Sequence, residues 1–242
     1  MKTLTQKLNY GSDIIEYSIV KTNRRKTSEV IVGKDTVEIR APIDKPDQEI
    51  RNIIKDKANW ILRKQKEYRD LSPDIMKPEF GENSTLPYLG TNYPLKILTE
   101  EAGNSISFAD GQFIINIWPS KNVTAQYIER LYEHWLMKIA RPVLKNKVET
   151  NSQKLGVNAP RKIIIKKLKN RWGSLSKNGD TINLNVNLVK ASADVVNYIV
   201  LHEICHLKIK EHSHHYWELL RKYMPDYEER ANWLNINGDN LL

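Results

Sequence analysis

The sequence has only one cysteine, Cys205, and no long apolar run among its 242 residues. A single cysteine excludes a disulfide within the chain, and it leaves any metal site dependent on histidine and carboxylate ligands. No stretch approaches the roughly eighteen consecutive apolar residues that cross a bilayer, and the first residues lack the apolar block and cleavage site of a signal peptide. We therefore expect a cytoplasmic protein.

The composition is that of an ordinary soluble globular protein, with 40% hydrophobic and 28% charged residues. A chain of this length and balance can bury a proper core. The formal net charge of +9 is concentrated in a basic segment between residues 154 and 177, which has no acidic residue. Its members are Lys154, Arg161, Lys162, Lys166, Lys167, Lys169, Arg171 and Lys177. Such a segment is more often a solvated face of a sheet than a binding site for nucleic acid or an acidic polypeptide.

Residues 1–119 are predicted to form an N-terminal β-rich domain with one helix. Apolar residues alternate along "DIIEYSIVKTN" and again on both sides of a turn at Gly33 to Asp35, which predicts a strand followed by a hairpin. Asp47 is the expected N-cap of a helix. One face of that helix is predicted to carry Ile50, Ile53, Ile54, Lys57, Trp60 and Ile61.

Residues 120–242 are predicted to form a second domain, which makes the fold class α+β. A long helical pattern from Thr124 ends at Gly156. Two strands, "RKIIIKKL" and "DTINLNVNLV", are joined through "KNRWGSLSKNG", where we expect Trp172 to pack and Gly173 to make a turn. Ser192 is then the expected cap of an apolar helix, and Ser213 the cap of the helix that follows.

Five of the six histidines lie in "LHEICHLKIKEHSHHYW", residues 201–217. His202 and His206 are four residues apart, so both imidazoles project from one side of a helix and their nitrogens can reach one ion. Glu203 lies about 100° further round the helix, where its carboxylate can face a water molecule. His-Glu-x-x-His is the zincin arrangement, with two zinc ligands and a general base on one element. The second domain is therefore predicted to be zincin-like, with a small sheet and an active-site helix.

The third metal ligand has three candidates. His212 is the first choice, because the chain can leave the helix after His206 and turn back to present it, while His215 and Glu218 lie on the next helix. The six-residue interval from His206 to His212 equals the metzincin spacing. Metzincins, however, have glycine where this chain has Ile209, and a β-branched residue does not readily adopt positive φ. We therefore expect a different turn.

This pattern predicts a zinc-dependent hydrolase that cleaves an amide, and a peptide bond is the expected one. A zinc-bound water would attack the carbonyl, with Glu203 removing its proton and passing it to the leaving nitrogen. Tyr216, Arg171 and His215 are the available candidates for contacting the substrate or its oxyanion. The strand that begins near Asp180 is expected to lie beside the cleft and to pair with an extended substrate.

The C-terminal half resembles the YgjP-like metallopeptidase domain, a predicted metal-dependent hydrolase related to the SprT-like and WLM zinc peptidases. The matching motifs are Arg171 to Ser174, Leu184 with Asn185, His-Glu-x-x-His, His212 to Trp217, and Pro225 to Tyr227. The stretches "RRKTSEVIVGKDTVEIRAP" and "LPYLGTNYPLKI" are similar to the family's N-terminal region, so the resemblance covers nearly the whole chain.

The resemblance implies that His202, His206 and His212 bind zinc and that Glu203 is the catalytic acid and base. The departures from the family pattern are small. Leu175 replaces a Cys or small residue, Ile204 and Cys205 replace Leu-Ala, and Glu211 replaces Asn. None of these removes a ligand or the base.

Two further functions are compatible with the sequence. The basic segment would suit a DNA-associated protease or a nucleic-acid-binding protein, for which binding should fall steeply with salt. A zinc-stabilised interaction module without turnover is the other, although a purely structural zinc site usually recruits a fourth protein ligand and needs no base between its ligands. A peptide or protein remains the expected substrate.

Overall fold

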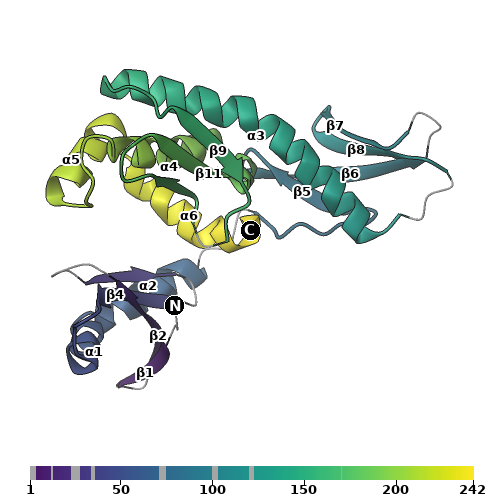
Figure 1. Cartoon of the computed structure of the whole chain (residues 1–242). Helices are drawn as coiled ribbons and strands as arrows, with labels where there is room; N and C mark the ends of the chain where they lie inside the picture. Colours follow the sequence, from purple (N-terminus) through teal and green to yellow (C-terminus); the bar gives the residue numbers. More distant parts are fainter. Residues whose placement is uncertain are drawn as a thin grey trace. The chain divides into compact units, whose positions relative to one another are not determined.

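A computed structural model gives the fold of the chain. The described residues are 4–11, 13–22, 28–33, 36–70, 75–99, 103–119, 123–169 and 171–242. The fold is mixed α+β, with helices and small sheets in two compact units, Met1–Pro73 and Asp74–Leu242 (Figure 1). No helix among the described residues is long and apolar enough to cross a membrane.

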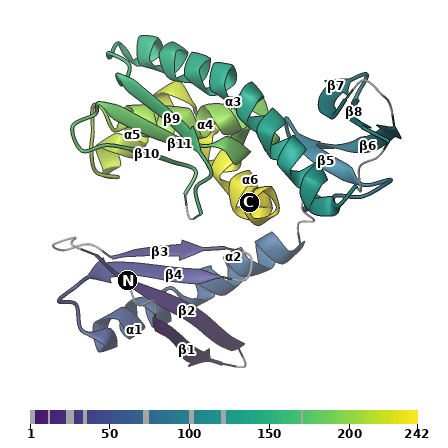
Figure 2. The same ribbon diagram turned by 45° about the vertical axis from the view of Figure 1, so that its right-hand side comes forward.

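The first unit is a four-stranded sheet with two helices (Figure 2). Its strands are β1 (Leu4–Tyr10), β2 (Asp13–Thr22), β3 (Glu29–Val32) and β4 (Val37–Pro42), in the order β1-β2-β4-β3. The predicted hairpin is confirmed, because β3 and β4 pair antiparallel with Val32 opposite Val37. Residues 34 and 35 of its predicted turn lie outside the described part of the chain.

The single helix predicted after Pro46 is two helices, α1 (Asp47–Asp56) and α2 (Ala58–Asp70). The break falls at Lys57, which is exposed and not on the buried face where it was predicted. Trp60, predicted on the buried face, is 36% exposed, whereas Ile61 is fully buried. The predicted N-cap is also shifted by one residue, because Pro46 caps α1 and Asp47 occupies its first turn, where a carboxylate favours the helix dipole.

The second unit begins with a sheet that packs on a long helix. Its strands are β5 (Thr85–Tyr88), β6 (Thr91–Thr99), β7 (Ser105–Ala109) and β8 (Gln112–Ile117), in the order β5-β6-β8-β7. The helix is α3 (Ala125–Leu155), and Gly156 ends it in the left-handed conformation, as predicted. Phe113 of β8 makes edge contacts with Tyr132 and Trp135 of α3. The boundary predicted between residues 119 and 120 therefore falls inside this unit, because the aromatic core spans it.

The other sheet of this unit has three strands, β9 (Lys162–Lys166), β10 (Gly173–Leu175) and β11 (Thr181–Asn185). The strand order is β10-β11-β9, so β11 lies in the centre with both edges paired. This corrects the expectation that the strand after Asp180 pairs with substrate. The edge strands are β10 and β9, and β10 is the one that lies against α4. Gly173 is the first residue of β10 and does not make the predicted turn.

A short 3-10 helix, η1 (Val186–Lys190), leads from this sheet to α4 (Ala193–Cys205), α5 (His214–Tyr223) and α6 (Tyr227–Leu241). Ser192 caps α4 as predicted, since its hydroxyl accepts from the Val195 backbone N–H. Helix α4 is the core of the unit, with Val196, Val200 and Ile204 at most 1% exposed. A polar side chain on this helix therefore needs a specific partner.

Candidate metal centre

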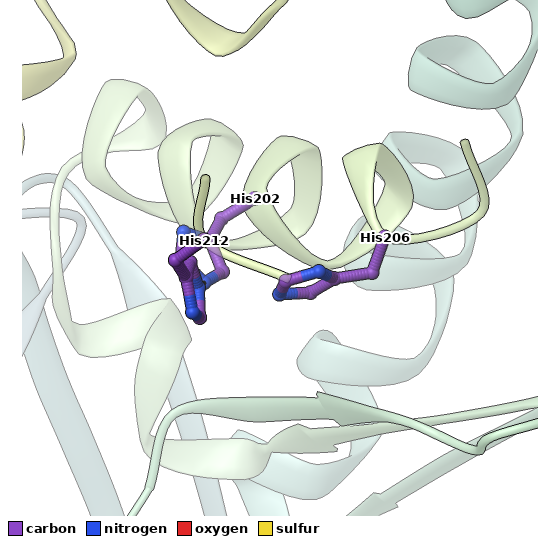
Figure 3. A group of neighbouring side chains, drawn as sticks. All are labelled: His202, His206 and His212. Atoms are coloured by element: carbon purple, nitrogen blue, oxygen red, sulfur yellow. The ribbon is translucent and has the colours of Figure 1, made fainter. Parts of the chain in front are cut away.

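Helix α4 and the turn that follows it bring three histidines together. His202 lies in the last turn of α4 and His206 is its C-cap, so the two share one side of the helix. The chain then turns through residues 207–211 and returns with His212, just before α5. Figure 3 shows the three rings gathered beneath the helix, with those of His202 and His212 directly beside each other.

The geometry of the three rings suits a shared ion. One nitrogen from each ring lies within 4.8 Å of the corresponding nitrogens of the other two. His202 Nε2 and His212 Nε2 are 3.0 Å apart. Two nitrogens at about 2.0 to 2.1 Å from a tetrahedral zinc ion would be roughly 3.3 Å apart. The three side chains could therefore accept a divalent ion after small adjustments.

The His206 ring is oriented by the turn after α4. Its Nδ1 lies 3.1 Å from the Ile209 carbonyl oxygen, which makes Nδ1–H the donor and leaves Nε2 as the atom with a free lone pair. Such a backbone acceptor behind a ligating imidazole fixes its tautomer and direction. Ile209 has no positive φ. The turn therefore differs from the glycine-containing turn of metzincins, as the sequence predicts.

Two aromatic side chains of α5 support the rings. Tyr216, fully buried, stacks on His206 with the ring centroids 4.7 Å apart and donates its O–H to the His202 carbonyl at 2.8 Å. Trp217 stacks on His212 at 5.4 Å and on Tyr227 at 5.5 Å. The exposed His212 thus contacts a ring that is itself packed against Tyr227. Sequence reasoning assigned no role to Trp217, although its place five residues after His212 was visible in the family motif.

The electrostatics favour neutral imidazoles, the form that binds a metal. Burial, followed by the neighbouring His212 and His206, lowers the pKa of His202 to about 3, and burial also lowers the pKa of His206. His202 Nδ1 is buried and has no hydrogen-bond partner among the described residues. Two imidazoles whose burial disfavours protonation, one of them with an unsatisfied nitrogen, make a poor packing motif and, with His212, a suitable donor set for zinc or a similar divalent ion. The residues present therefore fit a metal.

Glu203 directly follows His202 in α4 but does not belong to the histidine cluster. Its side chain is only 7% exposed, and burial raises the pKa of its carboxyl to about 7 against the opposing effects of the Leu175 backbone N–H and the Arg171 guanidinium. The Leu175 N–H, on the edge strand β10, donates to the carboxylate. A carboxyl whose pKa is near neutrality can accept and release a proton under ordinary conditions.

The backbone of β10 comes very close to Glu203 at Gly173. A Cβ atom placed on Gly173 would lie 2.7 Å from Glu203 Cγ and 2.9 Å from its Oε1. Asn185 of β11 holds the chain that leads into β10, because its side-chain Nδ2 donates to the carbonyls of Leu168 and Arg171 at 2.9 and 3.2 Å. Trp172 packs against the core as expected. Asn185 was visible in the family motif but received no role from sequence reasoning.

The three predicted substrate contacts have different surroundings. The Tyr216 hydroxyl already donates to the His202 carbonyl. His215 is 83% exposed and pairs with Glu218, as does His214. The structure therefore brings His212, and neither His215 nor Glu218, to the histidine pair. Arg171 is exposed and electrostatically coupled to Glu203, so it alone of the three combines accessibility with proximity to the base.

The positive field of the basic segment is partly neutralised. Lys167 pairs with Glu133 of α3, and Arg161 lies 4.0 Å from Asp180. Glu133 comes from a part of the sequence remote from the segment, so a count along the chain overestimates the local charge.

The sequence matches one protein family over most of its length, in keeping with this geometry. The match is to the YgjP-like, metallopeptidase domain family, over residues 26–237. The chain belongs to this family. It is therefore a metal-dependent peptidase or hydrolase by class, and the family implies a divalent metal.

Two solved structures are similar to part of the chain. The metallopeptidase zymogen jannalysin of Methanocaldococcus jannaschii is 32% identical over 38% of this chain and 86% of its own, with a TM-score of 0.34. The zymogen abylysin of Pyrococcus abyssi is 27% identical over 36% of this chain and 87% of its own, also with a TM-score of 0.34. No curated protein matches the sequence.

Proposed function

We propose that this chain is a zinc metallopeptidase in which His202, His206 and His212 hold the ion and Glu203 is the general base and acid. One observation carries the proposal. Three histidine nitrogens within 4.8 Å of one another lie beside a buried glutamate that is not part of their cluster. A set of three protein ligands with a separate carboxylate is the arrangement of a catalytic site, whereas structural zinc sites are usually closed by a fourth ligand.

The bound ion would acidify a water molecule and polarise the substrate carbonyl. Glu203 would take the proton from the attacking water and deliver it to the leaving nitrogen as the amide bond breaks. Its pKa of about 7 in the metal-free site supports both roles, because a group that gains and loses a proton in one cycle works best near the ambient pH.

Arg171 is the proposed contact for the substrate among the three residues considered. Arg171 is exposed, and its guanidinium is close enough to Glu203 to lower the pKa of that carboxyl. Five fixed N–H donors suit a carbonyl oxygen or a carboxylate of a peptide. Tyr216 instead supports the histidines, because its ring stacks on His206 and its hydroxyl donates a hydrogen bond to the His202 carbonyl.

The alternatives have less support. Two members of the basic segment are paired with carboxylates, and the rest are spread over β9, the loops that flank β10 and the end of α3. Nucleic-acid binding would require a steep loss of affinity with salt, and flat, weak binding to duplex DNA would remove that alternative. A non-catalytic zinc module has no use for the buried Glu203.

The direct test compares Glu203→Gln with the wild type. The variant should keep its metal, measured by elemental analysis, and should lose hydrolysis of casein or a peptide library by about 10²- to 10⁴-fold, the usual contribution of general acid–base catalysis. Glu211→Gln, which changes an exposed glutamate in the turn before His212, is the matched control. Undiminished hydrolysis by Glu203→Gln would remove the assignment of the base.

The metal itself is tested by exchange. Protein stripped with a chelator should recover activity with zinc at one ion per chain. Recovery with another divalent ion and none with zinc would keep the site and change the metal.

A further inference from the structure

Along the edge strand β10, the backbone N–H and C=O groups of successive residues point alternately toward β11 and away from it. Asn185 N–H donates to the Trp172 carbonyl at 2.9 Å, and Ser176 N–H donates to the Thr181 carbonyl at 2.8 Å. Ser174 lies between these two positions, opposite Asn183. In an antiparallel pair the residues that bond across the ladder alternate with residues that do not. The N–H and C=O groups of Gly173 and Leu175 therefore point away from β11, to the open edge of the sheet.

Glu203 lies against β10 at both residues. The Leu175 N–H donates to its carboxylate. Two residues earlier, Gly173 leaves the space in which the side chain lies, since a Cβ there would be 2.7 Å from Cγ and 3.1 Å from Cδ of Glu203. Gly173 has no positive φ, so its backbone would accept alanine without strain. The three atoms nearest to such a Cβ all belong to Glu203.

We propose that Gly173 and the Leu175 amide are positioning residues for Glu203, which hold its carboxylate against β10 and out of the metal's coordination sphere. The proposal rests on the proposed function of Glu203. Its carboxylate follows directly after His202 in the sequence, and a carboxylate is itself a good zinc ligand. A base that joined the ion as a fourth ligand would occupy the position that a reacting water needs.

The position of β10 is fixed independently of Glu203. Asn185 binds the loop before the strand through its side chain and bonds Trp172 through its backbone N–H. The Trp172 ring packs closely over Gly238 of α6, where an added Cβ would be 3.3 Å from the ring. Contacts with β11 and α6 hold β10 in place. The strand can therefore orient Glu203, because its own position does not depend on that side chain.

The first experiment compares Gly173→Ala with Ser174→Ala, its neighbour on the same strand. Gly173→Ala should lower kcat about 10- to 100-fold, in the range seen when the residues that orient a site are changed, while KM and metal content stay near the wild-type values. Ser174→Ala should leave all three unchanged. Wild-type kcat in a folded Gly173→Ala protein would overturn the proposal.

The second experiment needs no activity and uses the metal-free protein. Glu203→Ala should shift the Leu175 amide resonance and accelerate its hydrogen exchange, while Glu211→Ala should leave both unchanged. Gly173→Ala should lower Tm by roughly 4 to 8 °C in the wild type, as expected for overpacking, and by much less in the Glu203→Ala background. Comparing the Tm loss in these two backgrounds still reports the contact between Gly173 and Glu203 if Gly173→Ala is less stable than the wild type.

The two experiments separate this proposal from the proposed function. A Leu175 amide unaffected by Glu203→Ala, or a Tm loss at Gly173→Ala that is the same in both backgrounds, would overturn the positioning role whatever the enzyme does. A wild-type protein that binds metal and hydrolyses no peptide would contradict the proposed function while the Leu175 and Tm results stand.

Discussion

The histidines before Ser213 and those directly after it differ in what their rings contact. His202, His206 and His212 lie against the rings of Tyr216 and Trp217, and one nitrogen of each lies within 4.8 Å of those of the other two. His214 and His215 follow within three residues, are at least 82% exposed, and share the carboxylate of Glu218. The comparison shows that proximity in sequence does not bring a histidine into the cluster. Orientation by neighbouring groups does, since even the exposed His212 is placed by the rings that it contacts.

The largest expected effect is a loss of zinc affinity, seen when one histidine of each group is replaced by alanine and the two variants are compared. His206→Ala should weaken zinc binding by at least about a hundredfold, because it removes a proposed ligand. Changing a residue that only orients a ligand costs about 10- to 100-fold in affinity, so loss of the ligand itself should cost at least as much. His215→Ala should leave the affinity unchanged. Competition with a chelating dye measures both. Equal losses in the two variants would erase the distinction between the groups.

Acid titration of the metal-free protein should show the buried character of the site. Folding lowers the pKa of His202 from 6.5 to about 3. Between pH 3 and 6.5 the imidazole is therefore protonated in the unfolded chain and neutral in the folded chain. The free energy of unfolding should therefore fall as pH falls from 6.5 toward 3, and the contribution is fully retained above 6.5.

Glu203 acts in the opposite sense between pH 4.5 and 7, because its raised pKa makes the folded chain bind the extra proton. The titration is therefore best made by denaturant unfolding in the Glu203→Gln background, with and without His202→Gln. A slope that His202→Gln leaves unchanged would mean that the ring titrates as it does in water.

Trp217→Leu should have an intermediate effect. His212 is exposed and approaches the cluster from a turn, so loss of the stacked ring should let it move and should weaken zinc binding about tenfold, at the lower end of the range for residues behind a ligand. Trp118→Leu, at a tryptophan that is 44% exposed on the same unit, is the control. An affinity that Trp217→Leu does not change would assign the ring to packing alone.

Tyr216→Phe should have the smallest effect. The variant keeps the ring that stacks on His206 and loses the O–H donated to the His202 carbonyl, a bond worth about 1 kcal/mol. We expect a Tm loss of about 2 to 4 °C and peptidase activity within a few-fold of the wild type. Loss of activity as large as that of Glu203→Gln would indicate that Tyr216 contacts the reacting groups.

Local patterns predicted much of the fold. The hairpin of β3 and β4, the cap at Ser192 and the stop at Gly156 were correct because each depends on residues close in sequence. The break at Lys57 was missed, because the apolar spacing from Ile50 to Ile61 fits one continuous helix as well as two. The boundary at residue 119 was placed by the change from strand to helix patterns, which says nothing of the aromatic contacts between Phe113 and α3.

The grouping of the three histidines was predicted from the sequence, and the role of Glu203 stays a prediction. The spacing of His202 and His206 fixes their common side of α4, and Glu203 follows from the motif. The order of the strands was not readable, so β11 was assigned the edge that belongs to β10. The Leu175 amide was also invisible, because every residue but proline has a backbone N–H and only the fold decides where it points.

Anomalous diffraction at the zinc edge, on crystals of the protein purified with zinc, tests the central claim most directly. The account predicts a single strong peak that lies between His202, His206 and His212 and has no fourth protein ligand. A peak elsewhere, or one coordinated by the carboxylate of Glu203, would contradict it.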